Sequence, residues 1–547
     1  MKTISNRLLA NCHYIFFFIF FIIGLLIYKD YGFNIDETFQ RRSGFYWLNY
    51  LSNFFGLDKI SLISSQKLNT SINFTEPWSD VYGIIFDVPV AIIEIIFSIN
   101  EPLKIYEMRH FLTFIYFFVG IVFFYKILIN RFDSKFLSLF GCLMLIITPR
   151  IFGDSFQNNK DIIFLAFFII SIFCGFKVFE SYNLKNIIYF GVFSSIATST
   201  RLFGLVFPAS FLLIYLFMTL GNKKDLKLFK KISFYFLVYI FFLILHWPYL
   251  WSGPINNFLN FLNSVGNFGP GNVLFNGIFY NPKLVPYSYL STWIVISTPI
   301  LNLLMFFCGF LILSKFYLNK LLNVDVRKKT YDFWENINEK KDFYILILFV
   351  ILFFAGSFFQ VKHYNSWRMF YFLNFFIIYF SIFFINFSKS KVNKKKQKYL
   401  SLILIAFIFL NIIKLFQYHP YQSIYFNQFT SKKFIEGFEV DYTGLSGIEF
   451  LRYVVNDNSN NKKIKIGINS WYPLWRMAEL LPEKDRKRLI FLSNKNKENA
   501  DYIYSNRIYD VNIYLDDKYN LSRNFEKQKQ LMIDGALVYE IYKRKGL

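Results

Sequence analysis

Residues 14–27 read Tyr14-Ile-Phe-Phe-Phe-Ile-Phe-Phe-Ile-Ile-Gly-Leu-Leu-Ile27, an apolar run without a charged side chain. Similar runs recur along the 547-residue chain, which is 55% hydrophobic and contains 75 Phe residues. A soluble domain cannot bury so much apolar surface, whereas a bundle of helices can expose it to lipid. The sequence therefore predicts a polytopic membrane protein, all-α in its membrane domain. Because no small-residue cleavage site follows the first run, we expect it to be a retained signal anchor.

The apolar segments predict about eleven membrane-spanning helices. We expect these spans near residues 13–29, 110–129, 136–149, 161–178, 187–200, 202–220, 233–250, 292–314, 343–360, 369–387 and 399–416. The hydrophobic stretch 81–99 is excluded, because Asp87 and Glu94 lie seven positions apart and share one helical face. This stretch is expected to be an amphipathic helix at the membrane interface, within a long external loop at 30–109.

Basic residues are concentrated in alternate loops. The runs 222–231 and 388–398 are rich in lysine, and the loop 315–342 adds further basic residues. Positively charged loops remain on the cytoplasmic side, so this pattern predicts a cytoplasmic N-terminus and an external C-terminal region. We expect a bacterial inner membrane, with the periplasm outside. The formal net charge of +24 is then a consequence of topology and does not indicate nucleic-acid binding.

The composition changes to that of a soluble domain after about residue 416. Strand-like alternation occurs at 462–469, 488–493, 500–504 and 536–542, and residues 474–481 have a helical pattern. We expect a transmembrane domain at 1–416, followed by a small periplasmic α/β domain at 417–547. The cysteines lie in or beside apolar runs and predict neither a disulfide framework nor a zinc site: Cys12, Cys142, Cys174 and Cys308.

Two adjacent carboxylates, Asp36 and Glu37, follow the first span directly. An isolated loop acid is most often merely solvated, but an acidic pair at the mouth of a helix bundle can act as a base on a substrate at the membrane surface. Further polar residues gather on the same predicted face. They are Asp154, Lys160 and Asp161 in one loop, Arg201 in a tight turn, and His363 and Arg368 in a later loop. Their gathering opposite the lysine-rich face favours a shared anionic ligand over separate interface anchors.

The order of these motifs resembles that of the GT-C membrane glycosyltransferases. These include the bacterial aminoarabinose and protein O-mannosyl transferases, which use polyprenyl-phosphate sugars. The resemblance rests on the acidic pair in a long first loop, Arg109-His110, Gly153-Asp-Ser-Phe-Gln-Asn-Asn-Lys-Asp161 and Arg201-Leu-Phe-Gly204.

The resemblance is greatest to a bacterial branch of that superfamily whose substrate is unassigned, and it covers nearly the whole chain. Members of that branch have versions of Val273–Tyr280, Trp367-Arg368, His419–Asn427 and Glu439–Ser446. Asp154 and Met369 stand where the relatives are expected to have histidine. If those histidines assist the chemistry, this chain lacks them.

The resemblance implies transfer of a sugar from a polyprenyl-phosphate donor to an envelope acceptor, with inversion at the sugar carbon. Such a transfer develops negative charge on the departing phosphate, which basic groups must hold. Asp36 is then the candidate base, with Glu37 as its support. The candidate substrate-binding residues are Lys160, Arg201, His363, Arg368, Arg109 and His110. The leaving group is already activated, so no cofactor is required; Asp154 and Asp161 are the candidate ligands if a divalent metal takes part.

Two other classes of function remain open from the sequence. A polytopic transporter or lipid-sugar flippase would have ionisable residues near mid-bilayer and internal repeats, and neither is evident here. A noncatalytic envelope assembly protein with the same fold is the second alternative. The sugar, the acceptor (lipid, glycan or protein) and the oligomeric state are not determined by the sequence.

Overall fold

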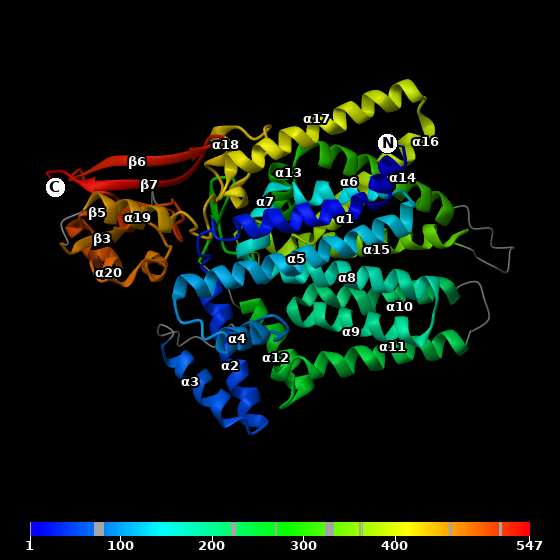
Figure 1. Ribbon diagram of the computed structural model, residues 1–547, viewed down its shortest axis with the longest axis horizontal. Helices are drawn as coiled ribbons and strands as arrows, with labels where there is room; N and C mark the ends of the chain where they lie inside the picture. The colour runs from blue at the N-terminus through cyan, green and yellow to red at the C-terminus, as the bar shows by residue number, and fades with distance from the viewer. Residues whose placement is uncertain are drawn as a thin grey trace.

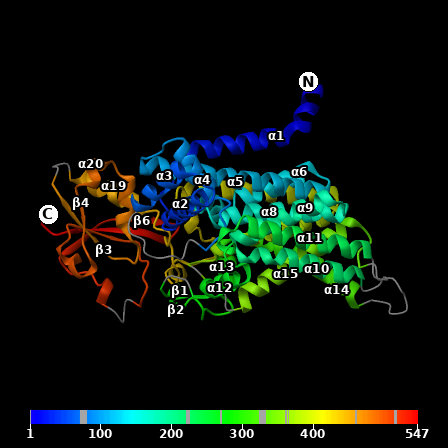
Figure 2. The ribbon, with the colours of Figure 1, turned by 90° about the horizontal axis from the view of Figure 1, so that it is seen from below.

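The computed structural model describes residues 2–70, 81–219, 226–267, 271–322, 333–359, 363, 365–458, 462–512 and 517–546. Long helices form a bundle, and a smaller unit containing a sheet lies beyond one end of it (Figure 1). The perpendicular view shows the same separation, with α1 (Lys2–Ile27) along one edge of the bundle (Figure 2). The predicted fold class, a helical membrane bundle with a small C-terminal α/β domain, is confirmed.

Every predicted span overlaps a helix. The helices up to the end of the bundle are α1, α2 (Glu37–Phe54), α3 (Asp58–Thr70), α4 (Asp87–Ile96), α5 (Pro102–Phe132), α6 (Lys135–Ile146), α7 (Pro149–Gln157), α8 (Asp161–Glu180), α9 (Leu184–Thr200), α10 (Val206–Thr219), α11 (Leu226–Leu245), α12 (Pro254–Asn267), α13 (Tyr289–Ser297), α14 (Ile300–Leu322), α15 (Ile337–Phe358), α16 (Leu373–Lys391) and α17 (Lys394–Tyr418).

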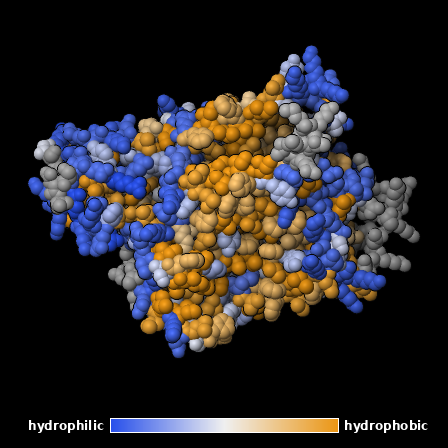
Figure 3. Space-filling view, viewed as in Figure 1, coloured by the Kyte–Doolittle hydropathy of each residue, from blue (hydrophilic) through white to orange (hydrophobic). Residues whose placement is uncertain are grey.

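Seven of the described helices are long and apolar enough to cross a membrane. The pair α6 and α7, bent by 70°, brings the number to eight if it is one span. The other predicted spans correspond to α9, α10 and the apolar part of α1, which are shorter. Hydrophobic residues cover the side of the bundle seen in Figure 3, as expected for a surface that faces lipid. The chain is thus a multi-pass membrane protein.

The excluded stretch 81–99 contains only the ten-residue helix α4, which is too short to span. Its two acids are held by basic side chains of neighbouring segments. Glu94 is buried and accepts hydrogen bonds from Arg41 on α2, and Asp87 accepts one from Arg109 on α5 at 2.8 Å. These pairs fasten α4 to α2 and α5, so the first external loop is a folded unit.

The C-terminal domain is built on a five-stranded sheet with the order β4-β3-β5-β7-β6. Its elements are α18 (Lys432–Ile435), α19 (Gly447–Asp457), β3 (Ile464–Ile468), α20 (Glu483–Arg486), β4 (Leu489–Phe491), β5 (Tyr502–Ser505), β6 (Phe525–Ile533) and β7 (Ala536–Arg544). Strand β3 is parallel to β4 and β5, whereas β7 is antiparallel to β5 and β6. A separate hairpin of β1 (Val273–Phe275) and β2 (Ile278–Tyr280) precedes α13.

Four of these strands are predicted by sequence alternation, and β6 is not. Strand β6 reads Phe-Glu-Lys-Gln-Lys-Gln-Leu-Met-Ile, which lacks apolar alternation over its first half because it lies at the sheet edge. The signal that was available is the Asp534-Gly535 turn, since both residues have positive φ and this dipeptide favours a two-residue hairpin. The predicted helix at 474–481 is a 3₁₀ segment, η6 (Leu474–Leu480).

A segment between the bundle and the sheet packs onto the loop that follows α1. The Ile35 N–H donates to the Thr443 carbonyl at 3.3 Å, and the Tyr31 hydroxyl donates to Gln422 at 3.2 Å. A Cβ atom at Gly32 would lie 2.6 Å from the Leu445 carbonyl oxygen, so this close approach requires glycine. Residues beyond the predicted boundary at 416 therefore form part of the surroundings of Asp36.

Candidate active site

The turn that presents Asp36 is fixed by its own sequence. The Asn34 side chain accepts a hydrogen bond from the Asp36 N–H at 3.0 Å, and the Glu37 carboxylate accepts one from the Asn34 N–H at 3.0 Å. These two bonds fix the turn that precedes α2, which begins at Glu37. The turn leaves the Asp36 side chain 35% exposed, while Glu37 is fully buried. The two adjacent acids therefore occupy different environments.

Glu37 has a positioning role in this arrangement. Its carboxylate lies 3.1 Å from Nε2 of His110, which is also buried. The neighbouring Arg109 forms the ion pair with Asp87 on α4. The predicted substrate-binding residues Arg109 and His110 thus lie in contacts between α5 and the first external loop.

Asp36 forms an ion pair with Arg368, although 332 residues separate them in the chain. Arg368 begins the 3₁₀ segment η4 (Arg368–Phe370), and its guanidinium lies 5.3 Å from the centre of the Tyr442 ring. Burial raises the pKa of the Tyr442 phenol and the charge of Asp154 adds to the rise, whereas Arg368 and Arg150 oppose it. Side chains from four distant segments therefore share one electrostatic environment.

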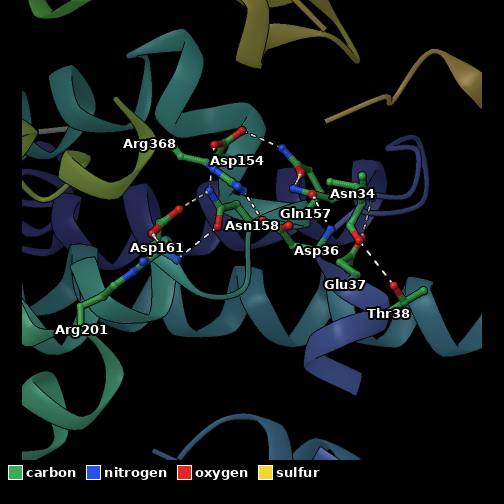
Figure 4. Close-up of polar contacts among 11 residues, drawn as sticks. Asn34, Asp36, Glu37, Thr38, Asp154, Gln157, Asn158, Asp161, Arg201 and Arg368 are labelled. Atoms are coloured by element: carbon green, nitrogen blue, oxygen red, sulfur yellow. Dashed lines mark hydrogen bonds and ion pairs between the residues drawn. The ribbon is translucent and has the colours of Figure 1, made fainter. Parts of the chain in front are cut away.

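The carboxylates of the second external loop are connected to the same turn by amide side chains. Asn34 donates to Gln157, and Gln157 donates to Asp154 at 2.6 Å. Asn158 donates to Asp154 at 3.1 Å and to Asp161 at 3.0 Å (Figure 4). We call the set Asn34, Asp36, Asp154, Gln157, Asn158, Asp161, Arg201 and Arg368 the site network.

Two further predicted cations belong to this region. Arg201 ends α9 and pairs with Asp161, the first residue of α8. The Lys160 ammonium lies 2.8 Å from the centre of the Tyr82 ring. Burial lowers the pKa of Lys160 well below its usual range and Arg201 lowers it further, whereas Asp161 and Asp36 oppose the shift. Lys160 therefore lies within the field of the site network, and a bound anion there would favour its charged form.

Asp154 and Asp161 are the predicted ligands of a divalent metal, and their hydrogen bonds show whether they are free to bind one. All four of their carboxylate oxygens accept N–H hydrogen bonds, from Gln157, Asn158 and Arg201. Among the residues that the structure describes, no group of three or more His, Cys, Asp or Glu side chains is placed to hold a metal ion. As arranged, this donor set does not fit a divalent cation, and metal dependence stays an untested prediction.

His363 lies apart from the site network. Its ring is buried against Tyr289 and Phe370, with ring centres 4.8 Å and 5.5 Å away. Burial lowers the pKa of His363 to about 4. A neutral imidazole among aromatic rings contributes packing and gives no positive charge to hold a phosphate.

Arg150 is a buried residue near the site network and is not among the predicted site residues. It is 1% exposed, and its Nε donates to the Tyr425 carbonyl at 2.8 Å. The guanidinium lies 5.1 Å from the ring centres of both Trp293 and Phe426. By hydrogen-bond geometry, neither of its terminal nitrogens has a partner in the part of the chain that the structure describes, although the Tyr371 hydroxyl lies near enough to interact with the guanidinium. Its position one residue after Pro149, at the start of a polar loop motif, was the available sequence signal.

Comparison with known proteins places these observations in a family context. Residues 88–251 match the family described as dolichyl-phosphate-mannose-protein mannosyltransferase. This segment contains Lys160 and Arg201, whereas Asp36 and Arg368 lie outside it. The match confirms the predicted resemblance to the GT-C membrane glycosyltransferases. None of the curated proteins matches the chain in sequence.

Two solved structures resemble the chain at low identity. One is ArnT from Cupriavidus metallidurans bound to undecaprenyl phosphate, with 11% identity, coverage of 97% of this chain and 98% of that one, and a TM-score of 0.44. The other is the Archaeoglobus fulgidus oligosaccharyltransferase in complex with Zn and sulfate, with 12% identity, coverage of 89% and 67%, and a TM-score of 0.44. Similarities this low do not establish a shared activity.

Proposed function

We propose that this protein is a membrane glycosyltransferase that moves a sugar from a polyprenyl-phosphate donor to an envelope acceptor on the periplasmic face. The observation that carries the proposal is the site network. A partly exposed carboxylate, Asp36, lies beside a buried arginine, Arg368, and both are joined to Asp161 and Arg201 at the start of α8 and the end of α9. The match of residues 88–251 to a mannosyltransferase family supports the same conclusion.

Asp36 is the general base in this proposal. It takes the proton from an acceptor hydroxyl, whose oxygen then bonds to the anomeric carbon of the sugar. The bond from that carbon to the donor phosphate breaks, and its electron pair leaves with the polyprenyl phosphate. A base and a leaving group on opposite sides of the sugar give inversion at the anomeric carbon. Glu37 supports the reaction by holding the turn that presents Asp36.

The leaving phosphate is held by arginine side chains. Arg368 and Arg201 pair with carboxylates in the structure, and a donor phosphate would share these guanidinium groups. Arg150 adds a guanidinium whose terminal nitrogens lack partners among the described residues. Lys160, whose ammonium is favoured by a nearby anion, supplies a further positive charge. In this proposal Arg109, His110 and His363 act by supporting the site.

The test of this function compares cells that carry the gene, lack it, or carry the Asp36→Asn form. Mass spectrometry of envelope glycans and glycolipids is expected to show one sugar modification in the first strain alone. Identical glycans in all three strains, with the protein present in the membrane, would refute the proposal. If the strain that lacks the gene accumulates a lipid-linked sugar on the cytoplasmic side of the membrane, the flippase alternative would be favoured.

Orientation in the bacterial inner membrane is part of the proposal. The basic residues of 388–398 support a cytoplasmic location for the turn between α16 and α17. We expect a reporter fused after Leu547 to be active in the periplasm and one inserted at Lys395 to be active in the cytoplasm. The reverse pattern would place the site network on the wrong side for a periplasmic acceptor.

The reaction is proposed to need no divalent metal, since the phosphate is bound by arginines. Transfer is expected to continue in excess chelator. Loss of transfer that returns on addition of a metal would contradict this.

A further inference from the structure

A cavity of about 790 Å³ lies between the first external loop and the C-terminal domain. One wall is formed by α2, α3 and the start of α5, and the other by η6 and β4. Thr38, which lies two residues after Asp36, is part of the lining. Asp36 is not part of the lining itself, but its charge acts on Arg476, which is. Its volume is within the range of sites that bind small ligands.

The lining of this cavity is strongly basic. Five of the described lining residues are basic, and the only acidic one among them is Glu479. The basic residues are Arg41, Arg42, Lys67, Arg476 and Arg486. Arg41 and Lys67 are fixed by ion pairs to Glu94, which is buried behind the wall. Counting Glu94 and Glu479 against them, the described lining residues still carry a net positive charge.

Arg476 links the cavity to the candidate active site. It comes from η6 of the C-terminal domain, is 8% exposed, and lies 5.0 Å from the centre of the Phe39 ring on α2. Burial lowers the pKa of Arg476 to about 10, while the charges of Asp36 and Glu479 oppose the shift. An anion in the cavity would lie in the same field and would favour the charged arginine.

Aromatic side chains complete the lining. Tyr106 of α5 and Trp475 and Phe491 of the C-terminal domain reach the cavity from opposite walls. The C–H faces of a sugar ring pack against aromatic faces, and guanidinium groups form paired hydrogen bonds with carboxylate or phosphate oxygens. Aromatic rings interleaved with arginines are thus suited to a saccharide that carries a negative charge.

We propose that this cavity binds an acidic saccharide, the acceptor onto which the sugar is transferred at Asp36. The inference rests on the proposed function, because the cavity is called an acceptor site only if Asp36 is the base. It gives the C-terminal domain a function, since Trp475, Arg476 and Arg486 belong to that domain. The acidic group is a carboxylate or a phosphate carried on the sugar, because the arginine side chains of the cavity can bind either anion.

The test uses the purified full-length protein in detergent and saturation-transfer NMR. The probes are a hyaluronan disaccharide, which carries a carboxylate, glucosamine 1-phosphate, which carries a phosphate, and neutral chitobiose. At least one acidic probe is expected to bind, more tightly than chitobiose and less tightly at high salt. The variant Arg42→Gln/Arg486→Gln is expected to weaken acidic-probe binding by about tenfold. Trp475→Ala is expected to weaken binding without changing its salt dependence.

The matched control is Lys433→Gln/Lys527→Gln, which removes the same charge from another cavity, between β1–β2 and the β6–β7 hairpin. It is expected to leave the binding of the acidic probes unchanged. Equal losses in both double variants, equal binding of acidic and neutral probes, or no binding of either acidic probe would overturn the proposal. If phosphatidylglycerol vesicles or inorganic phosphate alone bind in an arginine-dependent way and the saccharides do not, the site is a lipid or free-phosphate site and the inference is wrong.

Failure of the acceptor site can be separated from failure of the proposed function. Asp36→Asn is expected to retain acidic-probe binding, and Arg42→Gln/Arg486→Gln is expected to retain binding of a short polyprenyl phosphate. If the cavity variant loses the polyprenyl phosphate instead, the cavity belongs to the donor. That result would refute the acceptor assignment and leave the glycosyltransferase proposal intact.

Discussion

The chain places ionic groups at both ends of α8, and the two groups differ in how completely their buried polar atoms are paired. At the end opposite the site network lies what we call the distal cluster: Asn130, Arg131, Glu180, Lys341, Asp342 and Tyr379. Arg131 donates through two nitrogens to Asp342, which also accepts from the Tyr379 hydroxyl at 2.7 Å. Lys341 donates to Glu180 at 2.7 Å and to Asn130 at 2.6 Å.

Among the described residues, no buried polar atom of the distal cluster lacks a partner, whereas Arg150 beside the site network has two such atoms. The distal pairs join neighbouring helices of the bundle, such as α5 to α15, and Glu180 at their edge is partly exposed. The site network includes a partly exposed Asp36, lies close to Arg150 with its unpartnered nitrogens among the described residues, and adjoins a basic cavity. A buried ion pair alone is therefore weak evidence for a site. Buried polar groups without partners distinguish a candidate site from a structural pair better than exposure does.

The largest effect that would separate the two regions is expected for Asp36→Asn. This change keeps the size of the side chain and removes the charge that accepts a proton, so transfer should fall by about 10²–10⁴-fold. Because Asp36→Asn also leaves the buried Arg368 without this ion-pair partner, the thermal unfolding midpoint should fall as well. The measurement is the rate of sugar transfer per folded molecule, with Glu37→Gln as the companion variant of smaller effect. Near-normal transfer by Asp36→Asn would remove Asp36 from the reaction.

The matching change in the distal cluster is Arg131→Met. It leaves Asp342 buried without its cation, so the free energy of unfolding should fall by about 3–5 kcal/mol. Transfer per folded molecule should be unchanged. The paired variant Arg131→Met/Asp342→Leu should recover much of the stability, because both charges are then gone. A transfer defect in the paired variant that exceeds its stability defect would show that the distal cluster also serves the reaction.

A smaller effect is expected for Arg368→Gln and Arg201→Gln. Each removes a charge-assisted contact to the donor phosphate, which contributes about 1.5–3 kcal/mol to binding. Titration with a polyprenyl phosphate should show weaker binding in both variants, and unfolding curves provide the control for folding. If the free energy of unfolding falls while donor affinity is retained, these arginines have a structural role like that of the ion pairs in the distal cluster.

The smallest effect concerns His363 and the pH dependence of stability. Its pKa is about 4 in the folded protein, below the ordinary value of 6.5, so the unfolded chain binds a proton more readily. The contribution of this group to the free energy of unfolding is complete above pH 6.5 and is lost as the pH falls toward 4. The expected loss is about 2 kcal/mol between pH 7.5 and pH 5. His363→Phe should keep the aromatic packing and remove this part of the pH dependence in unfolding measurements. A wild-type protein whose stability shows the same acid dependence as the variant would contradict the assignment.

Part of the candidate site could be predicted from the sequence because its signals are local. The acidic pair Asp36-Glu37 after the first apolar run and the density of polar residues at 153–161 are visible in the chain itself. The predicted grouping of Asp36, Arg201 and Arg368 followed from a consistent topology. The different environments of Asp36 and Glu37 could not be predicted, because adjacent residues have the same sequence context and only packing against His110 buries one of them.

The sequence by itself determined the membrane bundle, the exclusion of 81–99 as a span, and most of the C-terminal sheet. These features follow from hydrophobic content and periodicity, which act over a few turns of helix or a single strand. Only the tertiary structure decided that Asp36 pairs with Arg368, that Arg150 keeps terminal nitrogens without partners among the described residues, and that the C-terminal domain forms one wall of a basic cavity. Each of these joins segments hundreds of residues apart, and the free energy of such contacts depends on shape and burial that no local pattern encodes.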